Sequence, residues 1–180
     1  PNVGGPLVPR PLMRQDPHSR NLPLHRLSDT PATFFITKSL LPKKPILDEA
    51  AREIIVSTFA FAVRQQRIYL RAFVVMPNHW HARFALREPW VLPKFVQALI
   101  SYVAGKTAAL LENYNSSWQH GYYETRVKTS KQFEFVSRYI EQNPVAKGLV
   151  ETPDEWVASC AKRKDLGLRC LMKNKLRSGH

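Results

Sequence analysis

Residues 68–86, IYLRAFVVMPNHWHARFAL, decide the fold of this chain. Two runs rich in apolar, β-branched and aromatic residues, 68–76 and 79–86, are separated by Pro77-Asn78. Such runs are typical of strands, and proline beside asparagine is typical of a turn. The stretch therefore predicts a β-hairpin with its turn at or near Pro77-Asn78.

Outward from the hairpin, further strands alternate with helices. Strands are predicted over residues 33–37 and 122–127, and helices over 48–66, 94–113 and 131–142. The third helix is expected to stop at Asn143-Pro144, because the residue before a proline disfavours helical geometry. The order β-α-β-β-α-β-α predicts an α+β fold, an α/β sandwich of mostly antiparallel sheet with helices on one face.

The charge of the chain points to a polyanionic partner. Its 180 residues include 27 Lys and Arg against 14 Asp and Glu, a formal net charge of +13. This surplus favours nucleic acid or an anionic membrane surface. No apolar stretch approaches the roughly 20 residues that span a bilayer, so no membrane helix is predicted. The start of the chain has no signal-peptide layout, and we expect a cytoplasmic protein.

The composition divides the chain into three parts. Residues 1–31 contain seven of the 14 prolines and predict an extended arm. Residues 32–160 hold the predicted elements and form the expected folded domain. Residues 161–180 carry seven Lys or Arg and one Asp, which predicts a basic tail. This tail either follows a phosphate backbone or is a solvated end. Cys160 and Cys170 form no CxxC pair and are expected to be reduced thiols.

Two histidines of the hairpin are the first candidates for chemistry. Side chains two apart on a strand project to the same face, so His79 and His81 would lie side by side while Trp80 packs into the opposite face. Adjacent imidazoles are a natural start to a divalent metal site. Such pairs also arise by chance on half-exposed strands, and two ligands are too few. A metal site here requires another ligand from elsewhere in the chain.

A second polar group lies at the end of the third predicted helix. Tyr139 and Asn143 are four residues apart and therefore neighbours on one helical face. A tyrosine hydroxyl is a nucleophile when a cation lowers the cost of its ionised form, and an amide oxygen is a hard ligand compatible with Mg²⁺ or Mn²⁺. The alternative is structural, with Tyr139 in the core and Asn143 as a C-terminal cap before Pro144.

Both groups occur together in a known family. The string VMPNHWH at residues 75–81 is followed about 60 residues later by YIEQNPVAKGLV at 139–150. This ordered pair resembles the single-tyrosine HUH transposases, most closely their REP-associated branch, named after repetitive extragenic palindromes. Shorter segments at residues 106–108, 117–124 and 152–156 match the same branch. The resemblance covers residues 32–160 and implies a ferredoxin-like fold with the HUH motif on a central strand.

The resemblance also implies a transposase that cleaves and rejoins single-stranded DNA carrying hairpin-forming palindromes. His79 and His81 would bind one divalent metal ion, Mg²⁺ or Mn²⁺, with Asn143 as third ligand and Gln142 as the less favoured choice. Tyr139 would attack phosphorus and leave a 5′-phosphotyrosine and a free 3′-hydroxyl. No nucleotide cofactor is implied, because the phosphotyrosine conserves the bond energy.

Basic and aromatic side chains are candidates for further DNA contacts. The candidates for phosphate contact are Lys106, Arg83, Arg126, Lys128 and Arg138. Trp118 and Tyr123 are candidates for base stacking, which contributes about 1–3 kcal/mol per base in single-strand binders. Of Trp118, Tyr122 and Tyr123, we expect at least two to pack against the core or the sheet instead.

Other functions remain open at this point. A replication initiator or relaxase of the wider HUH group is disfavoured by the single-tyrosine helix. A non-catalytic protein that binds palindromic DNA is disfavoured because the tyrosine and both histidines are intact. An RNA-binding protein of similar fold lacks an aromatic RNP motif. Insertion-sequence relatives are dimers with tyrosine helices acting in trans, whereas REP-associated ones are regarded as monomers. We expect a monomer, with a dimer as the alternative.

Overall fold

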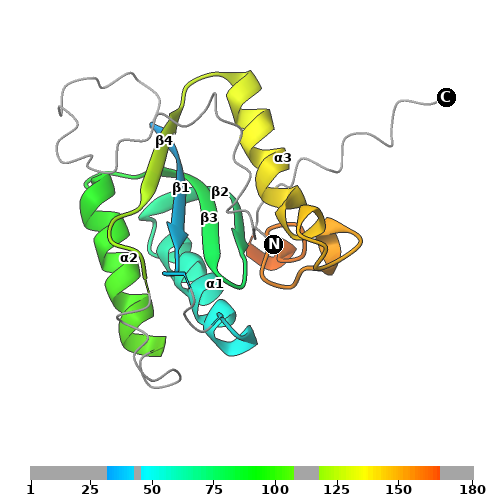
Figure 1. The fold of residues 1–180 in the computed structure, drawn as a ribbon. Helices are drawn as coiled ribbons and strands as arrows, with labels where there is room; N and C mark the ends of the chain where they lie inside the picture. The colour runs from blue at the N-terminus through cyan, green and yellow to red at the C-terminus, as the bar shows by residue number, and fades with distance from the viewer. Residues whose placement is uncertain (1–31, 43–45, 108–117, 167–180) are drawn as a thin grey trace.

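The computed structural model describes residues 32–42, 46–107 and 118–166 (Figure 1). Its elements are β1 (Thr33–Ser39), α1 (Glu49–Arg64), β2 (Ile68–Val75), β3 (His79–Leu86), α2 (Leu92–Thr107), β4 (Tyr123–Val127), α3 (Ser130–Ala146) and the short 3-10 helices η3 (Pro153–Glu155) and η4 (Lys164–Leu166). The predicted order of strands and helices is confirmed. The predicted arm, residues 108–113 of the second predicted helix, Cys170 and most of the predicted tail lie outside the described residues.

The four strands form one antiparallel sheet in the order β2-β3-β1-β4. The predicted hairpin is confirmed as β2 and β3, and its turn is closed by a 2.8 Å hydrogen bond from the Met76 N–H to the His79 carbonyl. β3 also pairs with β1, so it is a central strand. In that pairing His81 lies opposite Thr37, and His79 lies opposite Ser39. This register places Thr37 and Ser39 of β1 next to the two histidines of β3, although they lie far apart in the sequence.

Helices cover both faces of the sheet (Figure 1). On one face, the Trp80 ring packs edge-on against Phe59 of α1, and Phe84 packs against Phe95 of α2. On the other face, the Arg83 guanidinium donates to the carbonyl of Phe133 on α3. The expectation that all helices share one face is therefore wrong for α3. Seven of the eight residues of β3 are buried, so both faces of this strand require a covering element.

α3 continues past the proline that was expected to stop it. Pro144 lies inside the helix, and Asn143 is a buried helical residue, so the structural alternative in which Asn143 caps the helix is wrong. A proline cannot donate to the carbonyl four residues earlier, but so close to the end of a helix this loss affects one hydrogen bond. Beyond it, the Lys147 N–H donates to the Asn143 carbonyl at 3.1 Å. Gly148, with a φ of 66°, then ends the helix.

The segment after α3 packs back onto the body of the protein. Cys160 and Ala161 are buried, and Arg163 forms ion pairs with Glu53 of α1 and with Asp165. Residues 161–166, the beginning of the predicted basic tail, are therefore held against the domain. None of the helices within the described ranges is long and apolar enough to cross a membrane.

Candidate active site

The two histidines lie side by side on the face of β3 that α3 covers. Their ring centroids are 4.6 Å apart, and both side chains are buried, His81 completely. Trp80 projects to the opposite face, as its position between them predicts. The strand period thus places two imidazoles together, in an environment drier than the half-exposed strand considered from sequence.

A hydrogen bond holds the Nδ1 atom of each imidazole. His79 Nδ1 lies 2.6 Å from Asn78 Oδ1, which can only accept, so Nδ1 carries the ring proton. His81 Nδ1 lies 2.8 Å from the Thr37 hydroxyl. Both partners fix ring orientation. Because a hydroxyl can accept a hydrogen bond, His81 can also carry its ring proton on Nδ1, which leaves the lone pair on Nε2 as in metal-ligating histidines. Both Nε2 atoms are therefore suited to act as ligands.

Tyr139 reaches this pair from the middle of α3. Its hydroxyl lies 3.5 Å from His81 Nε2, the outer limit of hydrogen-bonding distance. The ring packs edge-on against Phe35 of β1, with centroids 6.1 Å apart, and against His81 at 5.2 Å. Burial raises the pKa of the Tyr139 phenol, while a hydrogen bond from Asn143 acts in the opposite direction. At neutral pH the phenol is therefore protonated, and a nearby positive charge would favour its ionised form.

Burial keeps both imidazoles neutral. The pKa of His79 is lowered to about 4 by burial and by the positive charge of Lys147. The pKa of His81 lies well below its usual value, because the ring is buried and His79 is adjacent. A neutral imidazole is the form that binds a metal ion. The site thus presents uncharged ligands at physiological pH.

Two buried polar atoms at the site have no hydrogen-bond partner among the described residues: His79 Nε2 and Asn143 Oδ1. Buried polar atoms are normally satisfied, so such atoms point to a partner of another kind. Gln142, the less favoured choice for third ligand, is only partly buried. Within the described ranges no three His, Cys, Asp or Glu side chains form a metal cluster. Two imidazole nitrogens and one amide oxygen nevertheless fit a divalent cation.

Comparison with known proteins identifies the family. The family model described as "Transposase IS200 like" matches residues 36–143, more than half of the chain, from β1 to Asn143. The chain belongs to the IS200-like transposase family. DNA is the substrate of transposases, which agrees with the net charge of +13. No curated protein sequence matches this transposase significantly.

One of two similar solved structures shows the same fold. A structure described as a REP-associated tyrosine transposase bound to a REP hairpin matches with a TM-score of 0.64 and 22% sequence identity, over 83% of this chain and 88% of that one. A protein of Deinococcus radiodurans R1, described as a candidate transposase, matches with a TM-score of 0.48 and 16% identity, over 67% and 97%. The first match confirms the predicted α+β architecture of this transposase.

Arg83 is not placed to contact DNA. It is 2% exposed, donates to the Phe133 carbonyl at 2.6 Å and to the Ser137 hydroxyl, and stacks on the Phe133 ring. Its odd position on β3 puts it on the same face as the histidines, where α3 covers it. The predicted phosphate contact is therefore corrected: Arg83 anchors α3 to the sheet of the transposase.

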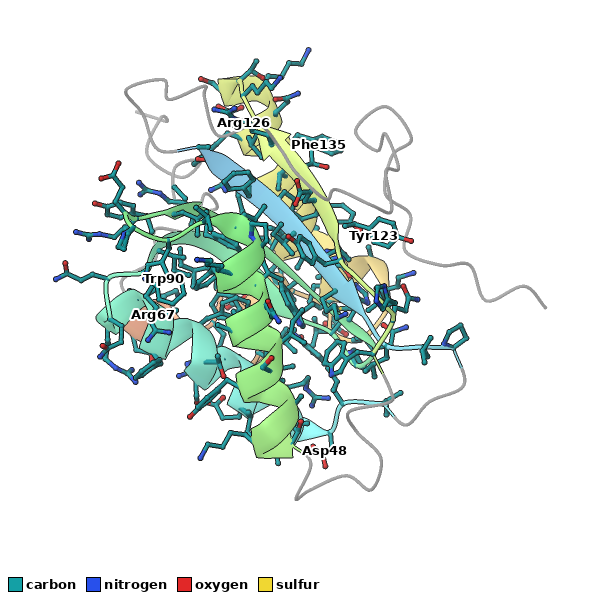
Figure 2. All side chains as sticks on the ribbon, turned by 90° about the vertical axis from the view of Figure 1, so that its left-hand side faces the viewer. Asp48, Arg67, Trp90, Tyr123, Arg126 and Phe135 are labelled. Atoms are coloured by element: carbon teal, nitrogen blue, oxygen red, sulfur yellow. The ribbon has the colours of Figure 1, made fainter. Side chains whose placement is uncertain are left out.

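The other candidate DNA contacts lie at different places on the transposase. Lys106 belongs to α2, on the opposite face of the sheet from the histidines, and its Nζ lies 5.7 Å from the centre of the Tyr102 ring. Arg138 is exposed on α3 directly before Tyr139. Figure 2 shows Arg126 near the junction of β4 with α3, and Tyr123 toward the other end of β4. Lys128 is exposed just beyond β4.

The aromatic candidates divide as expected. Trp118 and Tyr122 are partly buried against the hydrophobic core, whereas Tyr123 is 40% exposed. Two of the three therefore pack as structural residues, and Tyr123 keeps a surface available for contact.

Sequence patterns missed the partners of the histidines. Asn78 stands next to His79 in the quoted motif, and an amide directly before a candidate ligand is a usable signal. Thr37 carries no such signal, because only the pairing of β1 with β3 brings it to His81. Lys147 is also missed, although it lies eight residues after Tyr139 and so on about the same side of α3.

Proposed function

We propose that this transposase is a metal-dependent enzyme of the REP-associated branch, which binds single-stranded hairpin DNA and cleaves and rejoins it through Tyr139. The proposal rests on one distance. The Tyr139 hydroxyl lies 3.5 Å from Nε2 of His81, a buried and neutral histidine. A relative of the same fold is described as bound to a REP hairpin, which supports hairpin DNA as the partner.

His79 and His81, through Nε2, and Asn143, through Oδ1, would hold the metal ion, Mg²⁺ or Mn²⁺. The unpartnered Nε2 of His79 and Oδ1 of Asn143 support this set over one with Gln142. When bound, the cation supplies positive charge that polarises the scissile phosphate and stabilises the ionised tyrosine. Asn78 and Thr37 hold the imidazole rings in place from behind.

Tyr139 is the proposed nucleophile. Its phenolic oxygen forms a bond to phosphorus while the bond from phosphorus to the 3′-oxygen breaks. The phenolic proton is lost to solvent, and the departing 3′-oxygen takes up a proton to become a hydroxyl. The DNA then remains attached through a 5′-phosphotyrosine. Rejoining is the reverse reaction, in which the 3′-hydroxyl of another strand end attacks the phosphotyrosine.

The site is complete within one chain. Tyr139 on α3 and the histidines on β3 meet in the same protomer, and Arg83 fixes α3 on that sheet. This arrangement supports a monomer as the active unit, because no residue of the proposed machinery has to come from a second copy.

A covalent-capture assay tests the proposed function. Wild-type protein incubated with a labelled single-stranded palindromic substrate and Mn²⁺ is expected to give an adduct that survives denaturing electrophoresis, and EDTA is expected to remove it. Tyr139→Phe, which deletes one oxygen from a partly buried ring, is the matched control. An adduct formed equally by Tyr139→Phe would exclude this nucleophile. Tight hairpin binding by the wild type without any adduct would favour a non-catalytic DNA-binding protein.

A further inference from the structure

Basic side chains gather at the end of the sheet that lies away from the histidines. Ile68 at the start of β2 pairs with Leu86 at the end of β3. Thr33 at the start of β1 pairs with Ala85 of β3 and with Val127 at the end of β4. One edge of the sheet therefore carries these four strand ends. The basic end, as we call it, has five cations, Arg67, Arg87, Arg126, Lys128 and Lys131, against the carboxylates of Glu88 and Glu134.

The other end of the sheet, the histidine end, carries charges of both signs. Asp48 caps α1 beside the β2–β3 turn. The acidic helix η3 is held at the end of β2, because the Trp156 indole donates to the Val75 carbonyl at 2.9 Å. Lys147 is close enough to lower the pKa of His79. Figure 2 shows Asp48 well apart from Arg67 and Arg126. The surplus of positive charge thus lies at the basic end.

Aromatic rings hold two of the arginines of the basic end in place. The Arg67 guanidinium lies 4.6 Å from the centre of the Trp90 ring and 5.3 Å from that of the Phe61 ring. The Arg87 guanidinium lies 4.6 Å from the centre of the Tyr69 ring. Within the described ranges, no ion pair with a carboxylate involves either arginine. Both groups are therefore positioned before a ligand arrives and keep their charge for it.

We propose that the basic end binds the phosphate backbone of the hairpin stem. This inference rests on the proposed function, because it places a second part of the same DNA ligand. A duplex carries one phosphate charge per about 1.7 Å of its axis, twice the density of either strand alone, so fixed cations attract it more strongly. Proteins that bind single strands use aromatic platforms open to bases, whereas the arginines here cover the rings.

The length of β3 sets the distance between the stem contact and the cut. Arg87 follows His81 by six residues, and a strand advances about 3.3 Å per residue, so the two lie about 20 Å apart. A duplex rises about 3.4 Å per base pair, so this distance corresponds to about six base pairs. The metal site and the basic end would hold one hairpin at two points, and a stem too short to span them would lose the second.

The salt dependence of hairpin affinity tests the proposal. In a Tyr139→Phe background, affinity is measured over a range of salt for a palindromic hairpin of about twelve base pairs, twice the calculated span, with its single-stranded flank. Adding Arg67→Gln, Arg87→Gln and Lys128→Gln is expected to reduce the slope of log affinity against log salt by about 2–3, because each phosphate contact contributes about 0.9. The flank without the stem is expected to give the same slope with and without these substitutions.

Arg52→Gln is the matched control for Arg67→Gln. Arg52 is also a half-buried arginine over an aromatic ring, 5.1 Å from the centre of the Trp156 ring, but it lies at the histidine end. Arg67→Gln is expected to reduce the salt slope by about 0.9, and Arg52→Gln is expected to leave it unchanged. An equal reduction by both would contradict the proposal, because loss of net charge alone would then explain the effect.

Lys128→Gln keeps the test decisive if an arginine variant folds poorly, since Lys128 is exposed. It is expected to reduce the slope by about 0.9. An unchanged slope for Lys128→Gln and for every arginine variant that folds, as judged by circular dichroism, would overturn the stem contact. An equal reduction with the flank alone would overturn it in favour of a single-strand contact. Both readouts are affinities, so they are independent of adduct formation by the wild type, which decides the proposed function separately.

Discussion

The two faces of β3 are equally buried and chemically opposite. Toward α1 and α2, Trp80 and Phe84 make ring contacts with centroids 5.4 and 5.1 Å from those of their partners. Toward α3, His81 and Arg83 place ring and guanidinium nitrogens in the interior, tied to Thr37, Phe133 and Ser137. The first face is what a core requires. The second is costly to bury. The anchoring of α3 accounts for the Arg83 guanidinium, and the proposed metal site would account for the two imidazoles.

The cost of burying the histidines is seen in their pKa values, which burial lowers. A base whose pKa is lower in the folded state binds fewer protons there than in the unfolded chain. Stability is therefore at its full value above pH 6.5 and falls as the pH drops from 6.5 toward about 4, the pKa of His79. The apolar face of β3 has no such dependence.

The largest expected effect comes from removing both imidazoles. His79→Ala with His81→Ala is expected to abolish Mn²⁺-dependent adduct formation, a loss of at least about 10²-fold, because the charge that stabilises the transition state is no longer held. Adduct yield on a denaturing gel measures this effect. Hairpin affinity, measured in parallel, is expected to stay within about twofold. Retained cleavage would contradict the metal site.

The matched change on the other face is expected to act on stability. Phe84→Ala leaves a cavity beneath α2 and is expected to lower the free energy of unfolding by about 3–5 kcal/mol. Denaturant titration measures this change. Adduct formation per folded molecule, assayed below the unfolding transition, is expected to remain close to wild type. If Phe84→Ala instead stopped cleavage in fully folded protein, the assignment of stability to the apolar face and of chemistry to the polar face of β3 would be wrong.

The third ligand is tested by neighbouring substitutions on α3. Asn143→Ala is expected to weaken Mn²⁺ binding at least about tenfold, because it removes the amide oxygen proposed to bind the cation. Gln142→Ala is the control and is expected to change affinity less than about twofold. Calorimetry without DNA gives both numbers. The reverse order of effects would assign the ligand to Gln142.

The smallest expected effect is that of mild acid on metal binding. Two histidines with the ordinary pKa of 6.5 would lose roughly 70-fold in metal affinity between pH 7 and 5.5, because both rings protonate. With the pKa of His79 near 4 and that of His81 also well below 6.5, less than about a twofold loss is expected. Mn²⁺ titration at both pH values, with circular dichroism to check folding, measures it. A steep loss would mean that the pair is more exposed to water.

Local pattern predicted much of the fold and the centre of the site. The alternation of β3 put His79 and His81 on one face and Trp80 on the other, and helical spacing put Asn143 beside Tyr139. The end of α3 was mispredicted, because the local effect of Pro144 is small compared with the packing that continues the helix. The face covered by α3, and the contact of Thr37 with His81, depend on the pairing of β1 with β3, which no local pattern contains.

The anchoring of α3 by Arg83 makes the length of the chain before the nucleophile critical. Arg83 donates to the Phe133 carbonyl and to the Ser137 hydroxyl of α3, and Ser137 is only two residues before Tyr139. An α-helix turns by about 100° and rises by about 1.5 Å per residue. One residue inserted between Ser137 and Tyr139 would therefore swing the hydroxyl away from His81, whereas an insertion before the helix, near Lys128, would leave it in place. Tolerance to insertion and deletion should change abruptly between these two points.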